Sequence, residues 1–515
     1  MLKKLPIGIQ DFKKLREQNA LYVDKTEIIF RLIDQGSYYF LSRPRRFGKS
    51  LLISTLAAIF SGEKELFKGL WIEDKIEWKK HPVIRIDFTG DSVKELGVKV
   101  AVRGMIDAHA ERYGVELVKE DNRGRMGELV MKLHKKTEMQ VAVLIDEYDK
   151  PIIDNLENIE QAEENRDILK DFYGVLKPLD PHLKFVFLTG VTKFSKIAIF
   201  SDLNNLDDIT ITERYSTMLG LTTEEIDHAF ANRIPDTCKK LALTREQFDE
   251  QLKFWYNGYS WDTKNFVYNP FSILKFFINN SFENFWFSTG TPTFLVNFIR
   301  EKGLDITDLE EYPVTQTFFD KFDIKKIDII SLLFQTGYLT MKRKDEYGFI
   351  MLSYPNEEVR GAFSDNLLES YAHQEQSEIS KAMREMMLAL EENSLDIFCK
   401  EVNTLFASIP HQIFIAKKEA YYHSIIYLVL KLLGVYIETE VSTSRGRLDA
   451  VIKTKNFLYV IEFKMLPVTA EQALTQIKKK GYAKPYATDS REKFMIGISF
   501  NPEKREIGEM KIEAF

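Results

Sequence analysis

The segment with the clearest chemical signature joins a predicted strand to a predicted helix. Strand 38–41 leads into residues 42–50, SRPRRFGKS, and an apolar helical run follows. The order strand, loop, Gly48-Lys49-Ser50, helix is the context of a P-loop. Backbone N–H groups at a helix N-terminus attract phosphate, Lys49 adds a positive charge, and the Ser50 hydroxyl can ligate Mg²⁺. The loop therefore predicts a site for ATP and Mg²⁺.

Three arginines occupy the same loop, and one of them departs from the usual P-loop pattern. The pattern has glycine five residues before Gly48, whereas this chain has Arg43. Arg43, Arg45 and Arg46 could contact phosphate or a neighbouring subunit, or they could be solvated and form surface ion pairs. We expect Arg45, Arg46 and Gly48 to belong to the nucleotide site.

Two consecutive carboxylates indicate the second half of this site. The apolar strand 141–145 ends in Asp146-Glu147, and open α/β sheets bind ligands at the carboxyl ends of their strands. Asp146 would hold Mg²⁺, and Glu147 would orient or deprotonate the attacking water. The alternative is a helix N-cap, which the upstream P-loop disfavours. Thr189 follows strand 184–188 at the same crevice and could sense the γ-phosphate.

A second group of charged residues lies near the C-terminus. Asp449 and Glu462-Phe463-Lys464 lie in two apolar segments joined by the polar turn 453–456. Pairing about that turn places Asp449 opposite Val460 and diagonal to Glu462 on one face of a hairpin. Strand alternation keeps Lys464 on that face as well.

These residue types suit phosphodiester hydrolysis. Carboxylates on adjacent strands bind Mg²⁺ or Mn²⁺ through oxygen ligands, and Lys464 can stabilise developing charge or position the attacking water. Asp449 and Glu462 are therefore expected to be metal ligands. The alternative is an edge hairpin whose charges face solvent, but Tyr459, Ile461 and Phe463 make neither face look simply exposed.

The elements around both sites predict an α/β protein with several parts. Short apolar runs at 38–41, 83–88, 141–145 and 185–188 alternate with amphipathic helices, which predicts a mainly parallel sheet covered on both faces. Residues 224–280 read as a helical lid. A helix at 327–334, strands at 337–341 and 348–352, and a helix after Pro355 suggest a winged helix, which would contact DNA or serve only as packing between two catalytic domains.

Composition limits the class of protein. A chain of 515 residues with 44% hydrophobic and 29% charged residues predicts two to four globular domains. Cys238 and Cys399 are the only cysteines and lack metal-ligand spacing, so a reducing cytoplasm fits. The basic N-terminal residues lack the apolar stretch of a signal peptide, and no run approaches the length that spans a bilayer, so we expect a cytoplasmic protein. The net charge of −6 argues against a globally basic nucleic-acid coat but allows a local basic groove.

The motifs together resemble a known family, the bacterial and archaeal AAA-ATPase-like proteins with a C-terminal PD-(D/E)XK nuclease-like domain. The resemblance rests on YVDKT at 22–26, RPRRFGKS at 43–50, LIDEYDKP at 144–151 and YPN at 354–356, and it covers nearly the whole chain. It implies that an arginine in place of the first P-loop glycine is usual. It also implies that Glu419, in an apolar helical stripe, is the helix carboxylate found beside the metals of that nuclease superfamily.

We therefore expect a P-loop AAA-like ATPase core at 1–223, a helical lid and winged-helix-like region at 224–375, and an α/β PD-(D/E)XK nuclease fold at 376–515. The expected function is ATP binding and hydrolysis coupled to a metal-dependent nuclease, with DNA favoured over RNA, in defence or mobile-element control. The alternatives are a nucleotide-dependent switch whose nuclease fold holds nucleic acid without cutting, and a structural homo-oligomer with residual sites.

Overall fold

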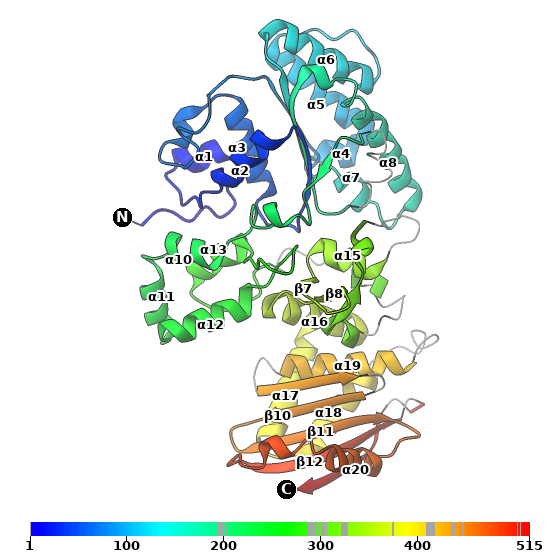
Figure 1. Cartoon of the computed structure of the whole chain (residues 1–515). Coiled ribbons are helices and arrows are strands. Elements are labelled where there is room, and N and C mark those ends of the chain that lie inside the picture. Colours follow the sequence, from blue (N-terminus) through cyan, green and yellow to red (C-terminus); the bar gives the residue numbers. More distant parts are fainter. Residues whose placement is uncertain are drawn as a thin grey trace. The chain divides into compact units, whose positions relative to one another are not determined.

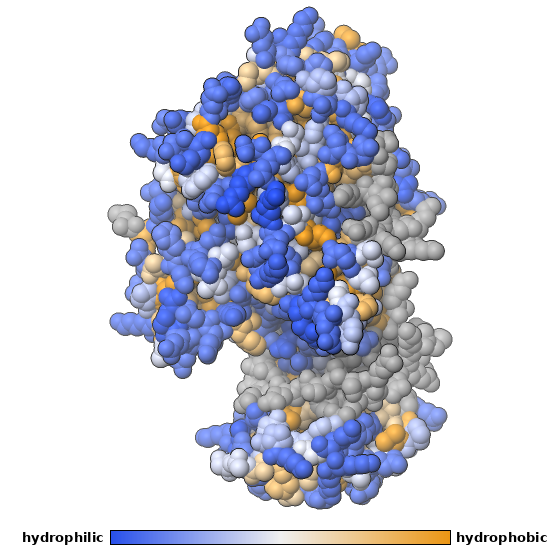
Figure 2. Space-filling view, viewed as in Figure 1, coloured by the Kyte–Doolittle hydropathy of each residue, from blue (hydrophilic) through white to orange (hydrophobic). Residues whose placement is uncertain are grey.

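In a computed structural model, the chain forms two compact units. The first unit is Met1–Trp286 together with Pro313–Glu357, and the second is Phe287–Tyr312 together with Glu358–Phe515. The structure describes residues 2–515 except 194–199, 201–202, 287–294, 297, 300–303, 305, 321–327, 373–374, 408–417, 434–437, 445–446, 502 and 505. Among the described residues, no helix is both long and apolar enough to cross a membrane. Figure 2 shows a face that is mostly hydrophilic, with hydrophobic residues in small groups.

The first unit is built on a parallel sheet with the strand order β2-β3-β4-β1-β5. Its strands are β1 (Tyr38–Ser42), β2 (Val83–Asp87), β3 (Val141–Asp146), β4 (Leu183–Gly190) and β5 (Asp207–Asp208). Every residue of β1 and β3 is buried, as expected for strands covered on both faces. The predicted parallel sheet is confirmed, and its strands extend one or two residues beyond most of the predicted apolar runs.

Helices cover both sides of this sheet (Figure 1). They are α1 (Phe12–Glu17), α2 (Thr26–Gln35), α3 (Lys49–Phe60), α4 (Asp91–Leu96), α5 (Val98–Tyr113), α6 (Asn122–Thr137), α7 (Lys150–Ile153) and α8 (Ile159–Gly174). Helix α3 packs against the interior strand β3, and α5 packs against the edge strand β2. The helix that follows the Gly-Lys-Ser loop is therefore anchored on an interior strand of the sheet.

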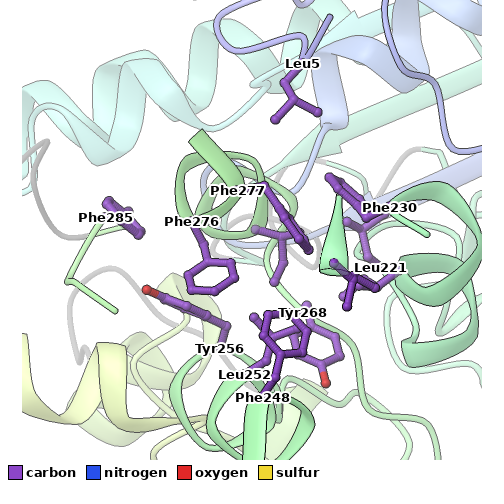
Figure 3. Packing of buried hydrophobic residues seen from close by; sticks show 13 residues of the cluster. Leu5, Leu221, Phe230, Phe248, Leu252, Tyr256, Tyr268, Phe276, Phe277 and Phe285 are labelled. Atoms are coloured by element: carbon purple, nitrogen blue, oxygen red, sulfur yellow. The ribbon is translucent and has the colours of Figure 1, made fainter. Parts of the chain in front are cut away.

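A helical module with its own aromatic core follows the sheet. It comprises α10 (Thr223–Ala229), α11 (Ile234–Leu241), α12 (Arg245–Tyr256) and α13 (Pro270–Asn279). Reciprocal side-chain to backbone bonds form capping boxes at the starts of α10 and α12. Phe276, Phe277, Tyr256 and Phe230 lie together in the interior (Figure 3), and Phe230 stacks on Phe277 with ring centroids 4.4 Å apart. The expected helical region is confirmed.

A helix and a hairpin complete the first unit. Helix α15 (Ile329–Thr336) precedes β7 (Thr340–Lys344) and β8 (Ile350–Ser353), which pair antiparallel, and β6 (Tyr312–Val314) pairs with β8. The predicted helix and hairpin are confirmed, although β7 begins three residues later than expected. This element packs on the loop after β1 and on the chain after β4, because a Cβ on Gly337 would lie 2.7 Å from Pro44 Cβ and Gln335 Oε1 accepts the Lys193 N–H at 2.7 Å.

The second unit contains a mixed sheet with the order β13-β12-β11-β10-β9. Its elements are α16 (Glu357–Ala372), α17 (Gln376–Glu391), α18 (Leu395–Ala407), α19 (Lys418–Leu433), β9 (Glu438–Ser444), β10 (Arg447–Lys453), β11 (Phe457–Met465), α20 (Ala470–Lys480), β12 (Glu492–Asn501) and β13 (Glu506–Ala514). Strands β11 and β12 are parallel, and the other pairs are antiparallel. A Cβ on Gly497 would lie 2.2 Å from the Ala470 carbonyl oxygen, so glycine permits the close approach of α20.

The aromatic core of the α10–α13 module gives the first prediction. Phe276→Ala should lower the free energy of unfolding by about 3–5 kcal/mol, because a fully buried ring leaves a cavity that its neighbours cannot fill. Phe254 belongs to the same module but is 57% exposed, so Phe254→Ala should change stability by less than about 0.5 kcal/mol. Urea denaturation followed by circular dichroism measures both. Equal effects of the two substitutions would contradict the assignment of this core.

Candidate functional site

The loop between β1 and α3 has the geometry of a phosphate-binding loop. Gly48 has φ of +92°, which side-chain-bearing residues rarely adopt, and α3 begins at Lys49. The buried Lys49 ammonium donates hydrogen bonds to the carbonyl oxygens of Arg43 at 2.9 Å and Pro44 at 3.0 Å. Ser50 is half-buried in the first turn of α3. Both side chains therefore belong to a helix N-terminus, where the backbone favours anions.

The charges of this loop interact with those at the end of β3. Burial lowers the pKa of Lys49, whereas the negative charges of Glu147, Asp146 and Asp149 act in the opposite direction. Burial likewise raises the pKa of Glu147, which Lys49 opposes. The structure therefore brings the predicted lysine and the predicted carboxylates into one electrostatic site.

Asp146 is the candidate metal ligand of this site. It is fully buried at the end of β3, and its Oδ1 accepts hydrogen bonds from Thr189 Oγ1 at 2.7 Å and from the Glu147 N–H at 3.1 Å. Its Oδ2 is buried without a hydrogen-bond partner among the described residues. An unpartnered buried carboxylate oxygen is costly, and a hard cation would satisfy it. The free Asp146 oxygen is therefore suited to accept a cation.

Glu147 has a backbone conformation that is unusual for its residue type. Its φ is +48°, in the left-handed region that glycine normally occupies. Such strain persists where the surroundings impose it, and it is concentrated at functional sites. The Tyr148 N–H, which follows directly, donates to the Thr189 carbonyl oxygen at 2.9 Å. The chain after β3 is thus held against the end of β4.

The three loop arginines have different environments. Arg43 is buried, donates to the carbonyl oxygens of Ser42, Thr210 and Tyr215, and lies 3.9 Å from the centroid of the Trp261 ring. The expectation that Arg43 is solvated or forms a surface ion pair is therefore wrong, because the side chain is buried and its two terminal nitrogen atoms donate to internal carbonyls. Burial lowers the pKa of Arg43 to about 9, which still leaves it charged at neutral pH.

The other two arginines are more accessible. The Arg46 guanidinium lies 3.7 Å from the centroid of the Phe271 ring, which favours a cation–π contact. Arg45 is exposed, and its charge acts on Lys49 by lowering the lysine pKa. Of the three, Arg45 has its charge near Lys49 and its side chain in solvent.

An apolar cavity of about 130 Å³ adjoins the loop. Its walls come from the chain before β1, the first turns of α3, the segment that leads into α10, the end of α10 and the start of α13. It is lined by Pro6, Leu15, Leu21, Tyr22, Val23, Lys25, Ile29, Phe47, Gly48, Leu51, Leu52, Thr55, Met218, Leu219, Gly220, Leu221, Phe230, Pro270 and Leu274. Gly48 belongs both to the phosphate-binding loop and to this lining, so an apolar group bound here would lie next to the loop.

The C-terminal hairpin has a different register from the one predicted. Asp449 pairs directly with Glu462, and Val460 faces Val451. The predicted pairing of Asp449 with Val460 is therefore wrong by two residues. The turn lies one residue later than expected, because Lys453 still pairs with Leu458 and the Thr454 N–H donates to the Phe457 carbonyl oxygen at 2.9 Å. A shift of two residues preserves the face on which each side chain lies.

Glu462 and Lys464 form an ion pair inside the second unit. The Lys464 ammonium lies 2.8 Å from Glu462 Oε1, and the exposed fractions of the two side chains are 11% and 0%. The side chains of Asp449 and Glu419 lie outside the described residues, although their backbones belong to β10 and α19. In the described part of the chain, no group of three or more His, Cys, Asp or Glu side chains forms a metal cluster. In the structure, Lys464 therefore balances the charge of the buried Glu462 carboxylate.

The N-terminal and C-terminal parts of the chain each match a known protein family. Residues 6–200 match the family described as "Predicted AAA-ATPase", and residues 417–510 match "PD-(D/E)XK nuclease superfamily". A protein of Azotobacter chroococcum mcd 1, named "Uncharacterized protein in vnfD 5'region", is 39% identical over 525 residues, which cover 99% of each chain. The chain belongs to this predicted AAA-ATPase family. The resemblance deduced from the motifs is confirmed.

In this predicted AAA-ATPase, Asp149 is a buried residue of the site that sequence reasoning missed. Its carboxylate accepts hydrogen bonds from the N–H groups of Val191 and Thr192 and from the Thr192 hydroxyl, at 2.6–3.2 Å. It therefore ties the chain after β3 to the chain after β4. The sequence signal for Asp149 was its position in the motif Asp-Glu-Tyr-Asp. The sequence does not show that its hydrogen-bond partners lie in the segment after Thr189.

The arginine environments give the second prediction. Arg43→Ala should destabilise the first unit of this predicted AAA-ATPase by about 3 kcal/mol, because it leaves buried carbonyl oxygens without donors and removes the cation over Trp261. The exposed Arg45 provides the matched control, and Arg45→Ala should leave the thermal midpoint almost unchanged. Differential scanning calorimetry measures the two midpoints. An unchanged midpoint for Arg43→Ala would show that its contacts contribute little to the fold.

Proposed function

We propose that the protein binds and hydrolyses ATP at the P-loop site and that its C-terminal domain is a metal-dependent nuclease acting on nucleic acid, in defence or control of mobile elements. The observation that carries the ATP part is the meeting of Lys49, Asp146, Glu147 and Thr189 at one end of a parallel sheet. A phosphate-binding lysine, a ligand for Mg²⁺ and a carboxylate base are the groups that phosphoryl transfer to water requires.

Each residue has a separate role in this proposal. Lys49 exchanges its loop carbonyl partners for the β- and γ-phosphates, and Arg45 supplies a second cation from solvent. Glu147 orients the attacking water and accepts its proton, a role that its raised pKa suits. Thr189 fixes the Asp146 carboxylate through its hydroxyl. Bound Mg²⁺, held by Ser50 and Asp146, would neutralise charge on the phosphates.

The cavity beside Gly48 supports a nucleotide rather than a free phosphate as ligand. Its lining is mostly aliphatic and aromatic, which suits the flat faces of a nucleobase. The base would then bind in the cavity while the triphosphate binds the loop. Arg46, stacked on Phe271, is the less favoured phosphate contact because it would have to leave that ring.

The nuclease part rests on the pairing of Asp449 with Glu462 and on Lys464. Carboxylates on neighbouring strands would hold Mg²⁺ or Mn²⁺, with Glu419 as an additional carboxylate. Lys464 would exchange its bond to Glu462 for one to the scissile phosphate. DNA is the proposed substrate ahead of RNA.

The P-loop assignment gives the third prediction. Lys49→Ala should weaken ATP binding by at least about 100-fold, because the buried ammonium is the loop's main phosphate contact. Glu147→Gln should keep ATP bound but slow hydrolysis by about 10²–10⁴-fold, since it removes the base and retains the ligands of Mg²⁺. Calorimetric titration and a phosphate-release assay measure the two effects. Lys64→Ala is the control, because this lysine is exposed and outside the site.

The hairpin gives the fourth prediction. Glu462→Gln should abolish cleavage dependent on Mg²⁺ or Mn²⁺, and Lys464→Met should slow it by about 10²–10³-fold. The exposed Glu471 of the same unit is the control, and Glu471→Gln should cleave normally. The assay uses linear, circular and single-stranded substrates with and without ATP, and ATP turnover should persist in every variant. If the wild-type protein hydrolyses ATP but cuts none of them, a nucleotide-dependent switch replaces the nuclease.

A further inference from the structure

The motif YVDKT at residues 22–26 forms a strap before β1 that the proposed chemistry does not use. Asp24 Oδ1 accepts hydrogen bonds from the Thr26 N–H at 2.8 Å and the Thr26 hydroxyl at 2.6 Å. Asp24 Oδ2 accepts the Trp71 N–H at 2.7 Å, and the Thr26 hydroxyl oxygen accepts the Ile72 N–H at 3.2 Å. The strap is therefore fixed to the sheet domain, with Lys25 between two anchored residues.

Lys25 extends from the strap to the segment that leads into α10. Its ammonium donates to the Thr217 carbonyl oxygen at 2.8 Å and contacts both carboxylate oxygens of Glu225, at 2.6 and 2.7 Å. The exposed fractions of the Lys25 and Glu225 side chains are 11% and 25%. Burial lowers the pKa of Lys25, and the charge of Glu225 counteracts that shift. Because both side chains are largely shielded from water, each charge is stabilised mainly by the other.

Glu225 is itself fixed by the start of α10. Its Oε2 accepts the Thr222 N–H at 2.8 Å, and the Thr222 hydroxyl accepts the Glu225 N–H, which closes the capping box. The wall segment 218–221 just before it is also constrained, since Leu221 and Tyr268 exchange backbone hydrogen bonds of 3.0 and 2.8 Å. The ion pair therefore joins two rigid pieces rather than two mobile side chains.

Both pieces contribute to the cavity beside Gly48. Leu21, Tyr22, Val23 and Lys25 line it from the strap, and residues 218–221 line it from the segment that leads into α10. The ion pair is a charged link between these two walls, and Lys25 itself belongs to the lining. Loss of the ion pair would remove this charged contact, and the apolar contacts and the hydrogen bond from Arg233 Nη2 to the Lys3 carbonyl oxygen would then hold the two pieces.

We propose that the Lys25–Glu225 ion pair is a clasp that holds the two walls of the base pocket together and so sets the affinity for the nucleobase part of the nucleotide. This proposal rests on the proposed function of the P-loop site. The clasp acts on the base and not on the phosphates, since neither Lys25 nor Glu225 belongs to the P-loop. Lys25 is thus a positioning residue, with an effect specific to ligands that carry a base.

The test compares two ligands that share the phosphates, a non-hydrolysable ATP analogue and inorganic tripolyphosphate, in the presence of Mg²⁺. Lys25→Met and Glu225→Gln should each weaken binding of the ATP analogue at least about tenfold, with little change for tripolyphosphate. The double variant should lose no more than the worse single variant, because both break the same link. Lys25→Arg, which retains the cation, should stay within about threefold of wild type.

The ion pair Lys264–Glu213 is the matched control, since its atoms are also 2.7 Å apart but its side chains are 65% and 60% exposed. Lys264→Met should bind both ligands as wild type does. Equal losses for the two ligands, or no loss in Lys25→Met and Glu225→Gln, would overturn the clasp. If Lys25→Met does not fold, Glu225→Gln decides alone, because it keeps an oxygen for the capping box. A wild-type protein that binds tripolyphosphate but not the ATP analogue would contradict the base pocket itself.

Discussion

The parallel pairing of β1, β4 and β3 is the constraint on which the nucleotide site depends. Because parallel strands end at the same edge, the loop after β1 and the residues that end β3 and β4 meet there. Lys49, Asp146 and Thr189, which are distant in sequence, can then share one buried set of charges and hydrogen bonds. The buried charges stabilise one another only in this arrangement, since any one of them without the others would be costly.

The rest of the first unit holds the phosphate-binding loop rigid. Arg43 replaces a flexible glycine with a side chain bonded to internal carbonyls and stacked on Trp261. Phe47 packs edge-on against the rings of Tyr259 and Trp261, with centroids 4.8 and 5.3 Å away. Carbonyl groups near the end of β1 and after β5 thus support the loop on one side, and aromatic rings from the segment between α12 and α13 also pack against it. A rigid loop keeps its backbone N–H groups preorganised for phosphate, which lowers the entropy that binding must offset.

Local patterns predicted most of the secondary structure, and distant partners account for most of what they missed. The helix expected at 327–334 could be predicted because its apolar residues and its capping residue Asp328 lie within one segment. The role of Arg43 could not be predicted from the sequence, because the Thr210 carbonyl group and the Trp261 ring that it contacts come from distant parts of the chain. The hairpin pairing of Asp449 was misplaced because Thr454 hydrogen bonds set the turn, and apolar alternation is unchanged by a shift of two residues.

The first unit is assembled from two separate stretches of sequence, which has a consequence for its synthesis. Residues 313–357 emerge from the ribosome only after residue 286 and the intervening segment. They nevertheless contribute Gly337, which packs against Pro44, and Gln335, which accepts a hydrogen bond from the Lys193 N–H. A nascent chain that ends before them leaves one side of the P-loop in water. Since domains fold as units during translation, the nucleotide site matures late, after about two thirds of the polypeptide has been made.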